Sequence, residues 1–179
     1  GKIHYDLDGN GYLTQDIVAP INTWTHIAWS KEGSVSKLYI NGELVNTSTT
    51  SSTVSLYGNY TLGKNDKIFE GSLDEVRFWS DVRTQSEIQD NLVANLTGIE
   101  QGLLAYYTFN YGNQNQVNSG LTTLYDTSNN HNGELNNFAL TGSSSNWSYG
   151  YIPTIEGANF FDLSSASSYT NKLSGGTWS

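Results

Sequence analysis

The chain has 179 residues, a formal net charge of −9 and no cysteine, a length that suits one domain with a sizeable core but not two ordinary ones. The acidic balance argues against nucleic acid as a partner, because phosphate binding requires clustered Lys and Arg. The lack of cysteine excludes disulfides and thiolate metal sites, and no apolar run in the sequence reaches the roughly 18 residues of a membrane span.

Two strands joined by a tight turn open the predicted order of elements. Ile3, Tyr5 and Leu7 alternate with polar residues and predict one face of a strand, and residues 12–18 predict its return. The turn between them is rich in Asp, Gly and Asn, which are the residues that tight turns favour.

The same turn also has the letters of a calcium-binding loop. Asp6 to Thr14 matches the first part of an EF-hand loop. The last position of that loop, however, holds Ile17 where a bidentate Glu is required, and Asp16 comes one place early. Since the flanks alternate as strands do, the sequence favours a hairpin tip over a calcium loop.

The clearest alternation of apolar and polar residues predicts three strands, at 24–29, 37–41 and 43–47. Asn41 and Gly42 separate the last two and supply the positive φ angles that a tight hairpin turn needs. Lys31-Glu32-Gly33 predicts the turn before them. The Ser- and Thr-rich residues 47–53 predict an exposed loop or sheet edge.

Two further strands are predicted at 56–62 and 72–79, with a polar loop between them. Alternation in the second strand places Asp74 on the same face as Val76 and Phe78. A carboxylate on an apolar face needs a partner, because a buried unpaired charge is costly. A bound cation or backbone N–H groups would satisfy it.

A metal site is therefore a candidate at this place. Asn65 and Asp66 lie just upstream of Asp74 in the sequence and supply the oxygen atoms that calcium prefers. We take Asp74, Asn65 and Asp66 as the candidate metal ligands, and calcium as the candidate cofactor.

One short helix is predicted over residues 86–96. Thr84 as N-cap and Glu87 three residues later form a capping box, and Gly98 ends the helix. An apolar strand over residues 103–109 follows.

The remainder of the chain is rich in Asn, Gly, Gln and Ser. Residues 126–133 gather side-chain oxygens that could hold a hard cation, and a plain Asx-type turn explains them at least as well. His131 has no spaced partner histidine, so a transition-metal site is not indicated. Residues 148–179 predict a linker or the start of a following module.

Aromatic residues make up 13% of the chain, a share high enough to ask which of them contact a ligand. Tyr and Trp stack on sugar rings when exposed, and serve as core residues with a polar anchor when buried. The candidate ligand-binding residues, near predicted turns, are Tyr57, Tyr60 and Tyr12. Core or inner-rim positions are predicted for Trp24, Trp29 and Trp79.

No arrangement in the sequence indicates catalysis. Glycoside hydrolysis requires two carboxylates that face a sugar across a cleft, and the predicted strand places Asp74 and Glu75 on opposite faces. His4 and His26 lie in predicted strands, where half-exposed positions are expected. The chain is predicted not to be an enzyme.

Four segments in fixed order resemble the laminin-G-like, concanavalin A-type jelly rolls, which are relatives of pentraxins and legume-type lectins. They are Trp24–Ala28, Leu38–Gly42, Leu62–Asp66 and Gly71–Trp79. The predicted helix and Gly102–Asn110 strengthen the likeness. Residues 132–142 with Asn146 and Trp147 are similar to modules of large secreted or surface proteins of Bacteroidota-type bacteria.

The resemblance implies an all-β fold, an antiparallel jelly-roll sandwich with one short helix. It covers residues 1–147 as one domain, and the family's N-terminal strands are expected to be missing from it. Asn65 and Asp66 fall where pentraxin-like relatives place calcium-binding residues, although the loop here is shorter. Asp74 matches an aspartate that holds a structural calcium in related glycanases, whose catalytic Glu-x-x-x-Glu motif is absent.

The resemblance also implies a function, namely a non-catalytic binding or adhesion module of a secreted or cell-surface bacterial protein such as an adhesin. Its rim loops would recognise glycan or a cell-surface protein, with calcium assisting, and its other partners would be modules of the same polypeptide. Two alternatives stay open. The chain could be an accessory carbohydrate-binding domain of a secreted polysaccharide hydrolase, or a structural spacer in a surface fibre.

Overall fold

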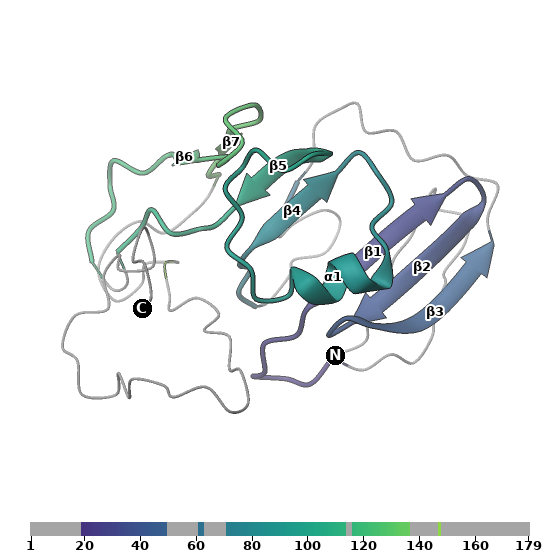
Figure 1. The fold of residues 1–179 in the computed structure, drawn as a ribbon. Helices are drawn as coiled ribbons and strands as arrows, with labels where there is room; N and C mark the ends of the chain where they lie inside the picture. The colour runs from purple at the N-terminus through teal and green to yellow at the C-terminus, as the bar shows by residue number, and fades with distance from the viewer. Residues whose placement is uncertain (1–18, 50–60, 63–70, 114–115, 137–146, 148–179) are drawn as a thin grey trace, which may run out of the picture. The chain divides into compact units, whose positions relative to one another are not determined.

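The computed structural model describes residues 19–49, 61–62, 71–113, 116–136 and 147 (Figure 1). The chain divides into two compact units, Gly1–Phe69 with Arg77–Leu104 and Glu70–Val76 with Ala105–Ser179. Within the described residues the elements are β1 (Ile27–Glu32), β2 (Val35–Ile40), β3 (Glu43–Thr49), β4 (Val76–Trp79), α1 (Gln85–Asp90), β5 (Leu103–Tyr107), β6 (Thr123–Leu124) and β7 (Gly133–Glu134).

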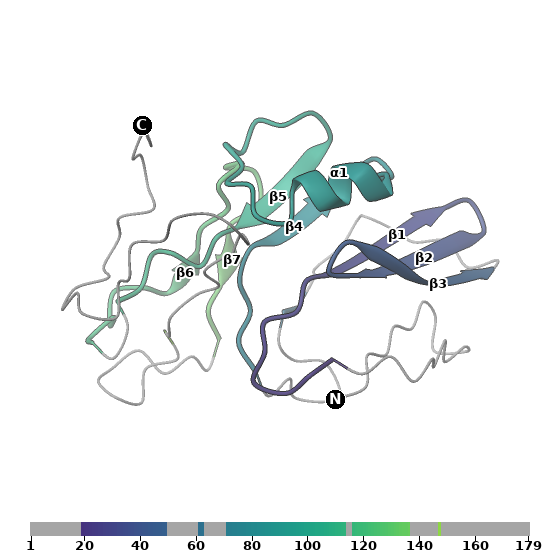
Figure 2. The same ribbon diagram turned by 60° about the horizontal axis from the view of Figure 1, so that its bottom comes forward.

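The first unit contains an antiparallel sheet of β1, β2 and β3, with β2 in the centre (Figure 2). Asn41 and Gly42 form the turn between β2 and β3 with φ angles of 50° and 79°. Two positive φ angles in succession match the right-handed twist of the strands they join. The hairpin predicted at Asn-Gly is therefore confirmed.

The central position of β2 explains its burial. Leu38 and Tyr39 are 1% and 3% exposed although successive strand residues point to opposite faces. Both faces of β2 are therefore covered. A register shift between these two residues places a bulge in the β2–β3 ladder.

β1 begins and ends later than the strand predicted over residues 24–29. β1 starts at Ile27, opposite the last residue of β2, and the side chain of Asn41 accepts a hydrogen bond from the backbone N–H of His26 at the turn. At its other end β1 continues through Glu32, and only Gly33 and the next residue turn. The prediction of a turn over residues 31–33 was therefore wrong, because the turn comes later along the chain.

Two tryptophans predicted as core or inner-rim residues are substantially exposed. Trp24 is 39% and Trp29 is 38% exposed. Trp24 precedes β1 and Trp29 lies on it, so alternation alone did not show how much of each ring is covered.

The capping box of α1 is confirmed. The Thr84 side chain accepts a hydrogen bond from the Glu87 backbone N–H, and the Glu87 carboxylate accepts one from the Thr84 backbone N–H. Ile88 is the buried residue of the helix. Figure 1 shows α1 beside the β2–β3 hairpin, where Gln89 donates hydrogen bonds to Gly42 and Glu43.

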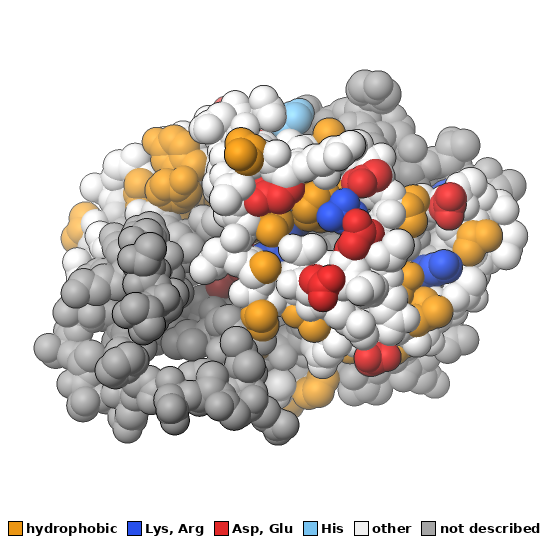
Figure 3. Space-filling model, viewed as in Figure 1, with side chains coloured by type: hydrophobic (Ala, Val, Ile, Leu, Met, Phe, Trp, Pro, Cys, Tyr) orange, Lys and Arg blue, Asp and Glu red, His pale blue; other side chains and the backbone are white. Residues whose placement is uncertain are grey.

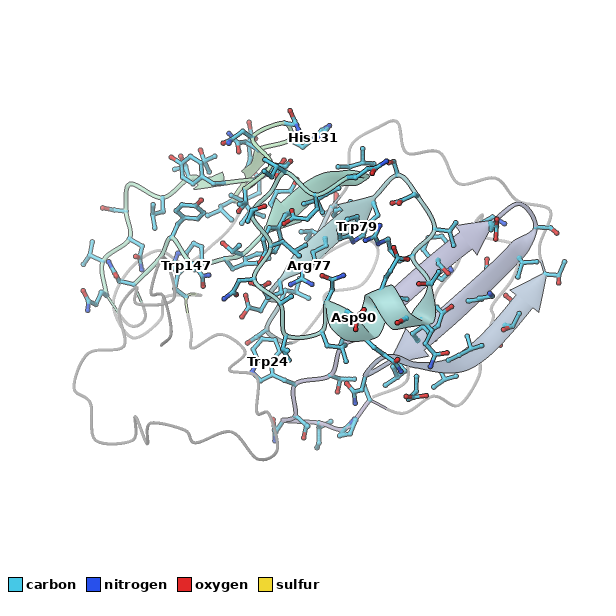
Figure 4. All side chains as sticks on the ribbon, in the orientation of Figure 1. Trp24, Arg77, Trp79, Asp90, His131 and Trp147 are labelled. Carbon is cyan, nitrogen blue, oxygen red and sulfur yellow. The ribbon has the colours of Figure 1, made fainter. Side chains whose placement is uncertain are left out.

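The helix ends at Asp90, six residues before the predicted end. The side chain of Asn91 donates to the Glu87 carbonyl, and the Arg77 guanidinium donates to the carbonyls of Asn91 at 2.6 Å and Ala94 at 2.8 Å. Side chains thus satisfy carbonyl groups at and beyond the helix end. Figure 4 shows Arg77 beside α1.

β4 and β5 form a two-stranded sheet, and β6 and β7 form another. The predicted strand over 103–109 ends at Tyr107, and Phe109 has a φ of 53° that breaks the extended backbone. Ala105, Tyr106, Leu124 and Trp147 are the buried apolar residues of the second unit that the structure describes. No helix within the described ranges is both long and apolar enough to cross a membrane.

Candidate functional site

The second unit is organised around the carboxylate of Asp126, which is 1% exposed. Its Oδ1 atom accepts hydrogen bonds from the backbone N–H groups of Tyr106 at 2.7 Å and Ser128 at 2.9 Å. Its Oδ2 atom accepts from the Ser128 hydroxyl at 2.6 Å and from the N–H groups of Asn130 at 3.2 Å and His131 at 2.9 Å. Five donors therefore converge on one buried carboxylate.

Further contacts close this loop on β5. The Thr127 backbone N–H donates to the Tyr106 carbonyl at 2.8 Å, and the Tyr107 hydroxyl donates to the His131 carbonyl at 2.6 Å. The side-chain oxygen of Asn132 accepts a hydrogen bond from the Asp126 backbone N–H. The loop between β6 and β7 is thus fixed at both ends and in its middle.

Charge follows from this geometry. Burial by itself raises the pKa of Asp126, but the hydrogen bonds from Ser128, Tyr106 and His131 outweigh it and hold the pKa below its ordinary value. The carboxylate is therefore ionised at neutral pH, and its hydrogen-bond donors stabilise the charge.

The cation interpretation of residues 126–133 is not supported by these contacts. Both oxygens of Asp126 already accept several hydrogen bonds, and the bond from the Ser128 backbone N–H, two residues later, is the one that defines an Asx-type turn. Within the described ranges, no group of three or more His, Cys, Asp or Glu residues could hold a metal ion. The Asx-type turn is the confirmed alternative.

An exposed aromatic pair lies in the same unit. The ring centroids of Tyr111 and Tyr125 are 4.8 Å apart with 52° between the ring planes. Tyr111 is 47% and Tyr125 is 42% exposed. Figure 3 shows hydrophobic side chains gathered on the surface over the β6 segment, which Tyr125 directly follows.

Tight packing positions both tyrosines. A Cβ atom on Gly112 would lie 2.0 Å from the Trp147 ring, so the backbone directly after Tyr111 rests on a buried indole. Tyr125 stands between buried Leu124 and buried Asp126. Neither tyrosine backbone can shift far without disturbing a buried neighbour.

Hydrogen bonds also connect the described residues that follow Tyr111. The Asn118 side chain, 4% exposed, accepts from the Asn113 backbone N–H and donates to the carbonyls of Asn113 and Gln116. One side-chain amide thus connects Asn113, Gln116 and Asn118.

Asp74 lies before β4 and not within it. β4 begins at Val76, and Glu75 has a φ of 54°, which is outside the extended conformation. The assignment of Asp74 and Glu75 to opposite faces of a strand was therefore wrong, because the backbone turns just before the strand starts. The Asp74 carboxylate accepts a hydrogen bond from the Glu75 N–H at 3.0 Å.

Glu75 has a different partner. The hydroxyl of Tyr106, which is 2% exposed, donates to the Glu75 carboxylate at 2.5 Å. This carboxylate therefore serves the packing of a buried tyrosine.

The other predicted site residues lie outside the described residues. They are Tyr12, Tyr57 and Tyr60 as ligand-binding residues and Asn65 and Asp66 as metal ligands. The structure therefore leaves these five as predictions.

Sequence reasoning missed Tyr111 and Tyr125. The signal available was their setting, since from Tyr106 to Gly133 the sequence contains no Lys or Arg and only one acidic residue, Asp126. Two tyrosines in a long uncharged, amide-rich segment could have been noted as candidates. The proximity of the two rings could not be predicted from the sequence, because it depends on how the loops close.

His26 in the first unit is half-buried, as expected, although it precedes β1. Burial, and secondarily the positive charge of Arg77, lower its pKa from the ordinary value. Its Nδ1 atom is buried and makes no hydrogen bond with the described residues. The surroundings of His26 therefore favour the neutral form of its imidazole.

The sequence matches the family model of the concanavalin A-like lectin/glucanases superfamily over residues 2–89. No curated protein sequence matches the chain. A crystal structure of a presumed carbohydrate-binding protein from Bacteroides ovatus matches with a TM-score of 0.53 and 21% identity, over 69% of this chain and 37% of that one. This chain therefore spans well under half the length of that protein.

A second crystal structure, of residues 221–444 of an S-layer domain-containing protein from Clostridium thermocellum, matches with a TM-score of 0.39 and 22% identity. It covers 45% of this chain and 44% of that one. The fold class rests on the family model and on the mostly antiparallel strands with one short helix. The predicted all-β, concanavalin A-like fold is confirmed.

Proposed function

We propose that this chain is a non-catalytic carbohydrate-binding module of a secreted or cell-surface protein. The observation that carries the proposal is an exposed tyrosine pair, Tyr111 and Tyr125, in a stretch of the chain whose one acidic side chain, Asp126, is buried. Tyrosine offers an apolar ring face and a polar hydroxyl together, which suits a sugar with its C–H and O–H groups. The likeness of fold to a presumed carbohydrate-binding protein supports it.

The use of the carboxylates supports a non-catalytic role. Asp126 accepts five hydrogen bonds, Glu75 accepts one from Tyr106, and Glu87 caps α1. A glycoside hydrolase instead requires two carboxylates that face the sugar. These three side chains are engaged in holding the fold.

Two other roles compete with this proposal. A structural spacer in a surface fibre would need no exposed aromatic pair, and an adhesion module could use the same surface for a protein. An accessory domain of a polysaccharide hydrolase would bind the same sugars as the module proposed here. Only the flanking polypeptide would distinguish an accessory domain of a hydrolase from the binding module proposed here.

Calcium assistance is a separate proposal. Asp74 is its one described candidate ligand, and Asn65 and Asp66 complete the candidate set. Calcium that binds the folded state would raise the midpoint of thermal unfolding. An unchanged midpoint on addition of calcium or of a chelator would reject this part of the proposal.

The experiment that tests the main proposal is a binding screen of the purified chain against soluble polysaccharides, followed by calorimetric titration. We expect saturable binding to at least one polysaccharide and no release of reducing sugar. Hydrolysis would overturn the non-catalytic assignment, and no binding to any polysaccharide would favour the spacer or the protein-binding role.

A further inference from the structure

We propose that Tyr111 and Tyr125 together form the surface that contacts an electrically neutral sugar unit. The inference rests on the proposed function and names its contact residues and ligand class. It differs from the sequence-based choice of Tyr12, Tyr57 and Tyr60.

The first argument is the state of the two side chains. Each ring is more than two fifths exposed while the rings contact each other at a centroid distance of 4.8 Å. Within the described part of the chain, neither hydroxyl group makes a hydrogen bond. Two apolar rings thus lie side by side and each carries an available hydroxyl group, which is a combination of apolar and hydrogen-bonding contacts that a pyranose can use.

The second argument is rigidity. Gly112 rests against the buried Trp147 ring beside Tyr111, and Asp126, with its five hydrogen bonds, lies beside Tyr125. A tyrosine has few rotatable bonds, and its backbone here is already ordered. Binding therefore loses little conformational entropy, which is the condition for affinity from a small contact area.

The third argument concerns charge and selects the ligand class. The one acidic group between Tyr106 and Gly133 is the buried Asp126, and this stretch has no Lys or Arg. A cationic ligand would find no exposed carboxylate in this stretch, and an acidic polysaccharide would find no cation and a chain with a net charge of −9. A neutral sugar meets neither penalty.

The test uses the whole chain and measures binding of soluble neutral polysaccharides, namely a β-glucan, an α-mannan and an arabinoxylan, beside acidic polygalacturonate. Tyr111→Ala and Tyr125→Ala are each expected to weaken binding of the neutral ligand about tenfold or more, as truncated aromatic contacts at binding hot spots do. Tyr125→Phe keeps the ring and should lose less. Polygalacturonate should not bind.

The matched control is Ile99→Ala, which truncates an apolar side chain that is 88% exposed in the other unit. It should bind as the wild type does. Thermal unfolding of each variant confirms that the fold is kept, and the Tyr125→Phe variant carries the test if an alanine variant does not fold.

The outcomes separate the two proposals. If the wild type binds a neutral polysaccharide and both tyrosine variants bind it equally well, the contact surface proposed here is wrong while the proposed function stands. Loss of binding in Tyr57→Ala or Tyr60→Ala alone would also overturn it in favour of the sequence-based choice. Binding of polygalacturonate alone would overturn the neutral ligand class, and no binding to any polysaccharide would overturn both proposals.

Discussion

The backbone N–H of Tyr106 donates a hydrogen bond to Oδ1 of Asp126, 20 residues later in the chain, at 2.7 Å. The carbonyl of the same tyrosine accepts one from Thr127. A carboxylate oxygen thus takes the place that a carbonyl of a neighbouring strand would occupy beside β5. This substitution lets an irregular loop continue the hydrogen bonding of a strand.

Asp126→Ala should therefore destabilise the fold strongly. It leaves five donors without their acceptor, one of them buried and four partly buried, and we expect a loss of about 3 kcal/mol or more in the free energy of unfolding. Urea denaturation measures it. The control is Asp90→Asn, on the exposed last residue of α1, where a change within about 0.5 kcal/mol is expected. Equal effects of the two substitutions would contradict the role assigned to Asp126.

The same carboxylate predicts a dependence of stability on acid. The pKa of Asp126 is lower in the folded chain than in the unfolded one, so the unfolded state binds the proton more readily. Its contribution is complete above the ordinary aspartate pKa and is lost as the pH falls through the lower folded value. Unfolding free energies measured from pH 6 down to pH 2 should fall less steeply for Asp126→Asn than for the wild type. Parallel curves would show that other groups govern acid unfolding.

His26 predicts a second dependence at higher pH. Burial and Arg77 lower the pKa of His26 in the folded state, so the unfolded chain takes up the proton first as the pH falls. Stability should therefore decrease as the pH falls below the ordinary histidine pKa, and His26→Gln should remove part of this decrease. The measurement is the free energy of unfolding at pH 7.5, 6.5 and 5.5. An unchanged slope in His26→Gln would assign the dependence to other groups.

The contacts of Arg77 and Arg83 predict that substitution by lysine affects stability differently at the two positions. Arg77→Lys loses the fork that reaches the carbonyls of Asn91 and Ala94, since an ammonium group cannot bridge them with the same geometry. We expect a loss of about 2 kcal/mol in the free energy of unfolding. Arg83 contacts the Trp79 ring, 4.1 Å from its centroid, and Asp81 at 3.0 Å. Arg83→Lys should therefore lower the free energy of unfolding clearly less than Arg77→Lys does. The reverse order would refute the capping role of Arg77.

Two glycines at positive φ separate backbone strain from crowding. Gly33 and Gly42 have φ angles of 55° and 79°, but a Cβ on Gly33 would meet nothing within 4 Å, whereas on Gly42 it would lie 2.8 Å from the Gln89 side chain. Gly33→Ala should cost about 1 kcal/mol for the φ angle alone. Gly42→Ala should cost at least about 1 kcal/mol more, since Gln89 and Leu92 must move. Thermal and urea unfolding of both variants check the difference.

Local signals predicted local structure well. The positive φ angles at Asn41 and Gly42 and the capping box of Thr84 and Glu87 follow from neighbouring residues, and both are present in the structure. Element ends were less accurate, because contacts from distant residues set them. Arg77, for example, binds the carbonyls beyond α1 from a strand that precedes it.

The candidate site was the least predictable part. The sequence shows that the loop around Asp126 is rich in oxygen atoms. Whether these atoms bind a cation or backbone N–H groups depends on β5, which is far away in the sequence. The pairing of Tyr111 with Tyr125 likewise depends on loop closure. Asp74 was placed on a strand by alternation, and the positive φ of Glu75 is a backbone feature that alternation does not reveal.

The position of Gly42 under Gln89 has a consequence for the order of folding. A helix as short as α1, with six residues, is not stable alone in water, because the cost of its first turn is not recovered over so few residues. Its support is the tip of the β2–β3 hairpin, where Gln89 and Leu92 lie against Gly42. The hairpin forms from residues close in sequence, so we expect it to form first and α1 to become helical only when it docks there. The amide protons of α1 should then gain protection from exchange with solvent after those of β2 and β3.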